Sequence, residues 1–175
     1  MVTAERILQE ATEHHLAGRA EKAEGLYREI LSSDPGNAGA LHRMGILALQ
    51  RNDYLAAIEF LQKALEISPE VPEALFGLGL ALQGAGDRER AIETYQRLLK
   101  IKPDNWECQN NLGNAYFGLG RIPEAAGAYR KATEIKPDCV DAMGNLGSAL
   151  HALGRTDEAI EVFRRGLAIA PDSPI

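Results

Sequence analysis

The stretch of sequence that decides the fold runs from Asn111 to Asp138 and reads NLGNAYFGLGRIPEAAGAYRKATEIKPD. In its first half, Leu112 and Tyr116 recur at helical spacing, and a glycine suited to the end of a helix follows them. In its second half, Pro123 lies where the first turn of a helix tolerates proline, and Pro137 ends that helix. The stretch therefore predicts two helices joined by a tight turn.

The same unit recurs along the whole chain with a period of 34 residues, which is set by Pro35, Pro69, Pro103, Pro137 and Pro171. With this proline numbered position 32, position 20 is always alanine: Ala23, Ala57, Ala91, Ala125 and Ala159. Position 8 is small (Ala11, Gly45, Gly79, Gly113 and Gly147), and position 24 is large (Tyr27, Leu61, Tyr95, Tyr129 and Phe163). Small residues indicate close helix crossings, and the large side chains are expected to fill the space between them.

In these positions the sequence resembles the tetratricopeptide repeat (TPR) family over about residues 4–173. The resemblance implies an all-α fold, a right-handed superhelical solenoid of ten antiparallel helices with two in each repeat. A single array is expected, with repeats at about residues 4–37, 38–71, 72–105, 106–139 and 140–173. The sequence departs from the family pattern at position 11 of the first repeat, where His14 stands, and at position 4, where no repeat has tryptophan and the residues are Ile7, Leu41, Leu75, Gln109 and Met143.

Local residues predict where the first helices begin and turn. Thr3 is a suitable N-cap for a helix over about residues 4–16, and a second helix is expected over about residues 20–31. In the second repeat Asn52 replaces the usual turn glycine, and asparagine can also adopt a left-handed backbone conformation.

Composition limits the possible classes of partner and the expected cellular location. The net charge is −6, whereas a nucleic-acid-binding surface needs clustered Lys and Arg, so no nucleic-acid partner is expected. No apolar run approaches the length of a membrane span, and no signal peptide is visible at the start, so no membrane partner is expected and a cytoplasmic setting is the default.

No motif indicates catalysis, a cofactor or a metal site. Cys108 and Cys139 form no CxxC pair and are interpreted as reduced structural thiols. His14 and His15 are adjacent on a helix and point to different faces, which argues against a shared metal ion. A nucleophile with a base, a phosphate-binding loop and paired catalytic carboxylates are all missing from the sequence, so we predict that the chain is not an enzyme.

Function is therefore expected on the first helix of each repeat, because these helices line the concave surface of a TPR superhelix. The stripe away from the core positions defines a neutral, mixed groove. We predict that a partner binds in this groove at His42, Arg43, Ile46, Phe76, Leu80, Asn110, Asn111, Asn114, Phe117 and Asn145.

Asparagines are the most suggestive residues in that groove, because a carboxamide both donates to and accepts from a peptide backbone. Asn111 and Asn145 both occupy position 6, which resembles the asparagine ladder of O-linked N-acetylglucosamine transferases, and that family grips extended peptides by their main chain. The alternative is that asparagine at this position is simply a solvated or helix-bridging residue. Phe76 and Phe117 have no core role on a groove face and predict apolar contact with a partner.

Three kinds of function fit these features. The first is a protein-protein interaction scaffold that binds a peptide or partner segment in the concave groove. The second is a substrate-recruiting TPR module of a larger enzyme such as a glycosyltransferase, and the third is a self-assembling structural array.

The last repeat carries its own expectation. TPR arrays usually finish with an extra helix of polar outer face, and only residues 172–175 follow the final proline, so the chain is interpreted as a fragment or an N-terminal module. Phe163 is expected to pack inward, while Val162 and Ile169 form an apolar edge that could mediate end-to-end self-association.

Overall fold

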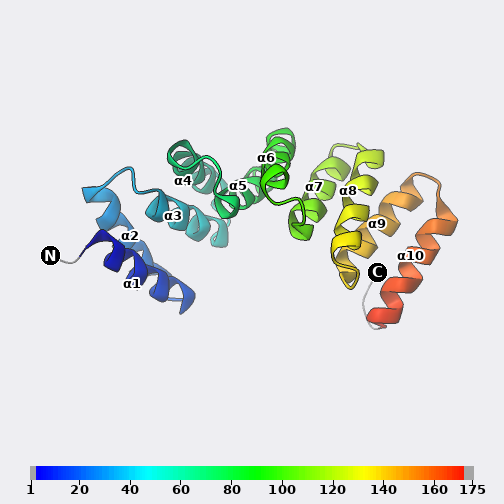
Figure 1. Ribbon diagram of the computed structural model, residues 1–175, viewed down its shortest axis with the longest axis horizontal. Coiled ribbons are helices and arrows are strands. Elements are labelled where there is room, and N and C mark those ends of the chain that lie inside the picture. The colour runs from blue at the N-terminus through cyan, green and yellow to red at the C-terminus, as the bar shows by residue number, and fades with distance from the viewer. Residues whose placement is uncertain (1–2, 172–175) are drawn as a thin grey trace. The chain divides into compact units, whose positions relative to one another are not determined.

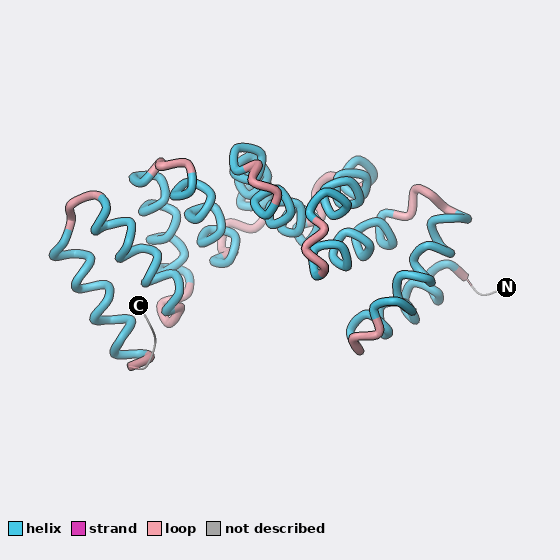
Figure 2. The backbone as a smooth tube through the Cα atoms, turned by 180° about the vertical axis from the view of Figure 1, so that it is seen from behind, coloured by secondary structure: helices cyan, strands magenta, loops and turns pink. Residues whose placement is uncertain are grey.

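The structure of the chain is a computed structural model that describes residues 3–171. Figure 2 shows helices joined by short loops, and none of residues 3–171 forms a strand, so the fold is all-α as predicted. In this range the helices are α1 (Ala4–Leu16), α2 (Ala20–Ser33), α3 (Ala38–Gln50), α4 (Tyr54–Ile67), α5 (Pro72–Gly84), α6 (Arg88–Ile101), α7 (Trp106–Gly118), α8 (Ile122–Ile135), α9 (Val140–Ala152) and α10 (Thr156–Ile169).

The helices belong to two compact units, Met1–Gly86 with α1 to α5 and Asp87–Ile175 with α6 to α10. In each unit, helices that follow one another in the sequence pack together, as the hairpins of α7 with α8 and of α9 with α10 illustrate (Figure 1). We call α1, α3, α5, α7 and α9 the first helices and the others the second helices. First helices also pack on one another, α3 on α1 and α5 in the first unit and α7 on α9 in the second. The single array over residues 4–173 remains a prediction.

Short polar side chains and left-handed turn residues set the helix ends. The side chain of Thr3 accepts a hydrogen bond from the Arg6 amide, which confirms the predicted N-cap of α1. Before α7, the Asn105 Oδ1 atom accepts from the Cys108 amide at 2.8 Å. In the turn after α3, Asn52 has φ of 58° and so takes the left-handed conformation that glycine adopts in the other repeats.

The second helix of the first repeat runs slightly further than the sequence predicted. The helix expected over residues 20–31 continues to Ser33, and Asp34 then leaves the helical conformation with φ of −138°. The reason is the following Pro35, whose ring disfavours helical geometry only at the residue directly before it. The proline therefore sets the helix end two residues later than we predicted.

Close helix crossings form the core, as the small and large positions of the repeat predicted. A Cβ atom added to Gly45 would lie 2.5 Å from the Leu61 Cγ atom, and one added to Gly113 would lie 2.5 Å from the Tyr129 Cδ1 atom. Gly147 meets the Phe163 ring in the same way, so Phe163 packs inward as expected. The hairpins of α3 with α4, α7 with α8 and α9 with α10 therefore close where a glycine of the first helix receives the large side chain of the second.

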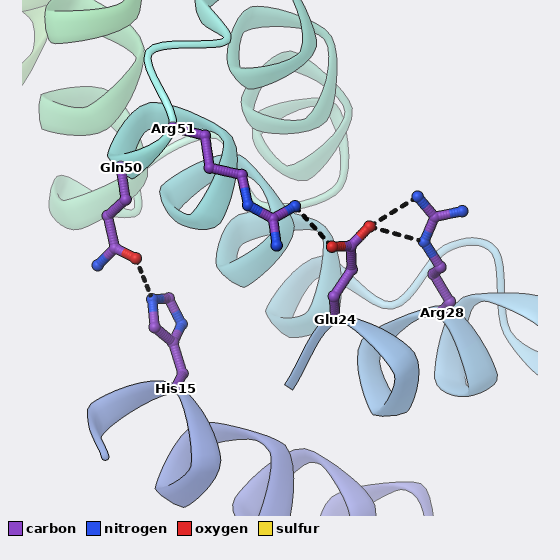
Figure 3. A network of polar contacts seen from close by, with 5 residues as sticks. All are labelled: His15, Glu24, Arg28, Gln50 and Arg51. Atoms are coloured by element: carbon purple, nitrogen blue, oxygen red, sulfur yellow. Dashed lines mark hydrogen bonds and ion pairs between the residues drawn. The ribbon is translucent and has the colours of Figure 1, made fainter. Parts of the chain in front are cut away.

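Polar contacts join the first two repeats in the first unit (Figure 3). The Glu24 carboxylate of α2 binds Arg51, just after α3, at 2.6 Å and Arg28 at 2.7 Å. The guanidinium of Arg51 has the largest effect and that of Arg28 the next largest, and together they hold the pKa of the Glu24 carboxyl below its usual range. His15 is buried beside Gln50, with 3.0 Å between Nε2 and Oε1. The network therefore fixes α3 against the hairpin of α1 and α2.

The two adjacent histidines confirm the prediction that they face different ways. His15 points into the contact with Gln50, whereas the His14 Nδ1 atom accepts a hydrogen bond from Arg19 at 2.7 Å. Both cysteines are free and buried, as predicted. Burial raises the pKa of the Cys108 thiol to about 12, so this thiol stays protonated and unreactive at neutral pH.

Candidate functional site

The predicted groove residues of the first unit come from two neighbouring first helices, and we call them the α3/α5 surface. All five side chains are half-buried, so part of each side chain remains accessible to a partner. The set consists of His42, Arg43 and Ile46 on α3 and Phe76 and Leu80 on α5.

Ile46 and His42 show how tightly this surface is built. A Cβ atom on Gly77 would lie 3.2 Å from the Ile46 Cδ1 atom, so the isoleucine lies against the backbone of α5. Burial lowers the pKa of His42, and the positive charge of Arg43 acts in the same direction. The buried His42 Nε2 atom has no hydrogen-bond partner among residues 3–171. A neutral imidazole therefore stands on this surface at pH 7.

The predicted groove residues of the second unit come from α7 and α9, and we call them the α7/α9 surface. Asn110, Asn111, Asn114 and Asn145 are half-buried, and Phe117 is 39% exposed. The exposed ring of Phe117 fits the prediction that its role lies outside the core.

Three of the four asparagines are brought together into one hydrogen-bonded cluster. The Asn145 Nδ2 group donates to the Asn110 Oδ1 atom at 3.0 Å and to the Asn114 Oδ1 atom at 3.4 Å. The Tyr129 hydroxyl of α8 donates to the same Asn114 oxygen at 2.8 Å. Burial raises the pKa of Tyr129 to about 12, so this hydroxyl keeps its proton at neutral pH. The asparagine cluster, defined here as Asn110, Asn114 and Asn145, thus ties three helices together.

This arrangement differs from the ladder that the sequence predicted. Asn145 donates its amide protons to Asn110 and Asn114, so it connects α9 to α7 as well as facing the surface. Asn111, which shares its repeat position, stays outside the cluster, and its side chain has no hydrogen-bond partner within the described range. The two position-6 asparagines therefore have different surroundings, and the ladder remains a prediction.

The cluster still has free hydrogen-bonding capacity. A carboxamide carries two donors and an oxygen that accepts twice, and Asn114 has both acceptor positions occupied. The Nδ2 groups of Asn110 and Asn114 are free to donate, and the Asn145 Oδ1 atom is free to accept. The cluster can therefore engage a group that offers both an acceptor and a donor.

Sequence reasoning missed Tyr129 as part of this site, because position 24 was assigned to the core. The available signal was the pairing of tyrosine at position 24 with asparagine at position 9 of the same repeat, which is Asn114. In the first repeat position 9 is Thr12, and the buried Tyr27 hydroxyl has no partner among the residues described. Asparagine at position 9 is therefore what connects the core tyrosine to the surface.

The apolar edge predicted on the last repeat is present but broader than expected. Ile169 is 48% exposed and Val162 is half-buried, while Ile160 and Leu167 are each 42% exposed. The segment after Pro171, on which the interpretation as a fragment rests, lies outside the described residues. End-to-end self-association through this edge stays a prediction.

Among residues 3–171, no group of three or more His, Cys, Asp or Glu side chains is placed to hold a metal ion. Within the same range, every helix is too short or too polar to cross a membrane.

Repeated helix hairpins with closely crossing backbones and half-buried mixed surfaces define the class of helical-repeat proteins. Comparison with protein families identifies the member of that class. The model of the tetratricopeptide repeat matches residues 8–72, 42–106, 76–138 and 110–174, in steps that reproduce the predicted period. The chain belongs to the tetratricopeptide repeat family.

Solved structures with the same fold cover nearly the whole chain. A crystal structure of MamA is 27% identical, with a TM-score of 0.87 over 91% of this chain and 93% of that one. MamA from Desulfovibrio magneticus RS-1 is 20% identical, with a TM-score of 0.90 over 98% and 97% of the two chains. YrrB is 23% identical, with a TM-score of 0.87 over 97% and 88%. Fold and family together make this chain a protein-protein interaction scaffold.

Proposed function

We propose that the chain binds an extended segment of a partner protein on the first helices of its second unit, α7 and α9, and that the asparagine cluster grips the partner's main chain. The observation that carries the proposal is the remaining capacity of Asn110, Asn114 and Asn145, which offers donors and an acceptor at one place. A peptide group offers one C=O acceptor and one N–H donor. Main-chain hydrogen bonds of this kind hold a segment without requiring a particular side chain.

The mutual hydrogen bonds of the cluster favour such a grip. Asn145 is held by Asn110 and Asn114, and Asn114 is held by the Tyr129 hydroxyl at 2.8 Å. Side chains that are already ordered lose less rotamer entropy when a ligand binds. The cluster therefore supports tighter binding than three independently moving asparagines would.

Apolar contacts supply the second part of the interaction. Phe117 follows Asn114 by one helical turn on α7, and its 39% exposed ring gives a partner side chain an aromatic surface. In the first unit, Ile46, Phe76 and Leu80 offer half-buried apolar side chains. Aromatic side chains at the centre of an interface often carry most of its binding energy. We expect Phe117 to be the strongest single contact of the α7/α9 surface.

Relatives support peptide binding, and the charge distribution supports a protein partner. YrrB is described as a TPR protein with an unusual peptide-binding site. Of the ten predicted site residues only Arg43 carries a fixed charge, so binding should depend only modestly on salt. We propose binding without catalysis, to a protein or peptide rather than to nucleic acid, in the cytoplasm. The recruiting module of a larger enzyme and the self-assembling array are not favoured by these relatives.

The test begins with selection of binding peptides from a displayed random library on the purified chain. The tightest peptide that loses affinity for Phe117→Ala is then titrated by fluorescence anisotropy. Asn110→Ala combined with Asn145→Ala should weaken it by about tenfold, because two main-chain hydrogen bonds of about 0.7 kcal/mol each are lost. Leu55→Ala is the matched control, since Leu55 is 78% exposed on the second helix α4. Equal affinity of the double variant and the parent chain would refute the grip.

A further inference from the structure

A trough lies on the second-helix side of the second unit, away from the predicted groove. It has a volume of about 770 Å³, is walled by α6 and α8, and has α7 as its floor. On α7 the floor residues are Gln109, Leu112 and Tyr116, which share one helical face. The α7 asparagines of the α7/α9 surface, Asn110, Asn111 and Asn114, occupy a different face of the same helix. The trough is therefore separate from the surface considered above.

A missing side chain keeps the trough open. Gly127 lines its α8 wall, and a Cβ atom added there would meet nothing within 4 Å. The same repeat position carries glutamate in the second, third and fifth repeats, as Glu59, Glu93 and Glu161. Glycine inside a helix costs about 1 kcal/mol relative to alanine. The fourth repeat thus accepts a less stable helix at the place where the trough is hollow.

The carboxamide of Gln109 lines the floor of the trough. Gln109 is 7% exposed, and its side chain has no hydrogen-bond partner among residues 3–171. The second, third and fifth repeats place Leu41, Leu75 and Met143 at this position, all buried. The amide atoms of Gln109 are not among the buried side-chain atoms that lack a partner, so they are open to the trough. A ligand in the trough would satisfy this group.

Tyr116 adds a second polar contact to the floor. Its hydroxyl accepts a hydrogen bond from the Gln96 Nε2 group at 2.9 Å, which leaves its own proton free to donate. Gln109 offers both a donor and an acceptor beside it. Leu99, Leu112 and Ala128 supply the apolar part of the lining. The floor can therefore hold a main-chain segment together with one apolar side chain.

The rim of the trough is locally positive in a chain whose net charge is −6. Lys100 and Lys131 line it, and neither has an ion-pair partner within the described part of the chain. Glu124 also lines it, but Arg121 neutralises that carboxylate at 2.8 Å. Glu134 is the remaining unpaired acid of the lining. Two free ammonium groups against one free carboxylate favour an acidic ligand.

We propose that this trough is a second binding site, which takes a short acidic peptide segment carrying an apolar anchor side chain. The anchor lies on Leu99, Leu112 and Ala128, over the gap that Gly127 leaves. The segment's main chain hydrogen-bonds to Gln109 and Tyr116. Its carboxylates pair with Lys100 and Lys131. The trough shares no residue with the asparagine cluster, so the two binding proposals can be tested independently.

The test uses the same displayed random peptide library, with counterselection against Gly127→Glu, which restores the side chain found in three other repeats. Peptides that bind the parent chain and not this variant are sequenced, and the tightest is titrated by fluorescence anisotropy. We expect acidic peptides with a large apolar residue. Gln109→Leu should weaken binding by about five- to tenfold, the effect of losing one hydrogen bond to the peptide.

Two features make the result decisive. Gly127→Glu and Gln109→Leu should both raise the melting temperature while weakening binding, so misfolding cannot explain the loss. Lys131→Glu should weaken binding, and the matched control Lys22→Glu, on exposed Lys22 of α2, should not, although it changes the net charge equally.

Several outcomes would overturn the proposal. It fails if counterselection leaves no peptide, if the recovered peptides are basic or uncharged, or if Gln109→Leu binds them unchanged. The proposal also fails if light scattering detects self-association that Gly127→Glu removes, because the trough would then bind a second copy of the chain. Peptides sensitive only to Asn110→Ala and Asn145→Ala would support the first-helix surface and refute the trough.

Discussion

Replacing Gly113 by alanine should destabilise the chain, although alanine is normally the better residue in a helix. The added methyl group would lie 2.5 Å from the Tyr129 Cδ1 atom, and Tyr129 is 2% exposed, so the ring has no free space into which it can move. Overpacking of this kind costs about 1–3 kcal/mol. The gain in helix propensity offsets about 0.8–1.0 kcal/mol of that cost.

The first repeat indicates which part of this range applies. It carries Ala11 at the same position, opposite Tyr27, and both are 0% exposed, so a hairpin of this type can be spaced for a methyl group. The two helices of the fourth repeat can approach the helix spacing of the first repeat if they move slightly apart, and this movement costs free energy. We therefore expect a net loss near 1 kcal/mol for Gly113→Ala, in the lower half of the overpacking range.

Gly127→Ala is the matched control, because it makes the same chemical change in the adjacent helix where a Cβ atom meets nothing within 4 Å. It should stabilise the chain by about 0.5–1 kcal/mol. Urea unfolding followed by circular dichroism measures both variants against the parent chain. If Gly113→Ala proves as stable as Gly127→Ala, the close crossing with Tyr129 is wrong.

Three further predictions concern other parts of the molecule. Ala125→Leu should lower the free energy of unfolding by about 1–3 kcal/mol, since Ala125 is 0% exposed at a helix crossing, and unchanged thermal stability would contradict the repeat register. Arg51→Ala should lower the free energy of unfolding at pH 7, measured by urea unfolding, because the ion pair with Glu24 is lost. That loss should shrink as the pH falls through the lowered pKa of Glu24, because the protonated carboxyl no longer attracts the guanidinium; a loss independent of pH would refute the ion pair. NMR titration should place the pKa of His42 below the ordinary value of 6.5, because burial disfavours the charged imidazole. The neutral imidazole is then compatible with the fold above pH 6.5, and stability is lost as the pH falls and the unfolded chain takes up the proton more readily. A titration midpoint at or above 6.5 would contradict the burial of His42.

The repeat and its helices could be predicted from sequence because they depend on local and strictly periodic features. Pro35 and its equivalents give the period, and Thr3 and Asn52 act through their own backbone neighbourhood. The contacts of position 8 with position 24 were also predictable, since Gly113 and Tyr129 lie in one hairpin. Periodicity determines which residues face the neighbouring helix.

The asparagine cluster could not be predicted in the same way. Its hydrogen bonds depend on how far α9 is displaced along α7, which decides whether Asn145 reaches Asn110 or Asn111. A shift of a few ångströms between two helices changes the partner without changing the period. The sequence therefore identified these asparagines as candidates and missed their connections.

The trough illustrates a second limit. The sequence showed that position 4 lacks the tryptophan of the family pattern, but it did not single out Gln109 or connect it with Gly127, which lies in the other helix of the hairpin. The two residues matter together because one leaves a hollow and the other places a carboxamide on its floor. Departures from a repeat thus become informative when the structure brings them to the same place.

The most direct test of the central claim is an NMR titration of the isotope-labelled chain with the selected peptide that depends on Phe117. We expect the side-chain amide signals of Asn110, Asn114 and Asn145 to shift together with the Phe117 ring signals, and saturation to give a single affinity. Shifts confined to the second helices, with the three asparagine amides unmoved at saturation, would contradict this claim.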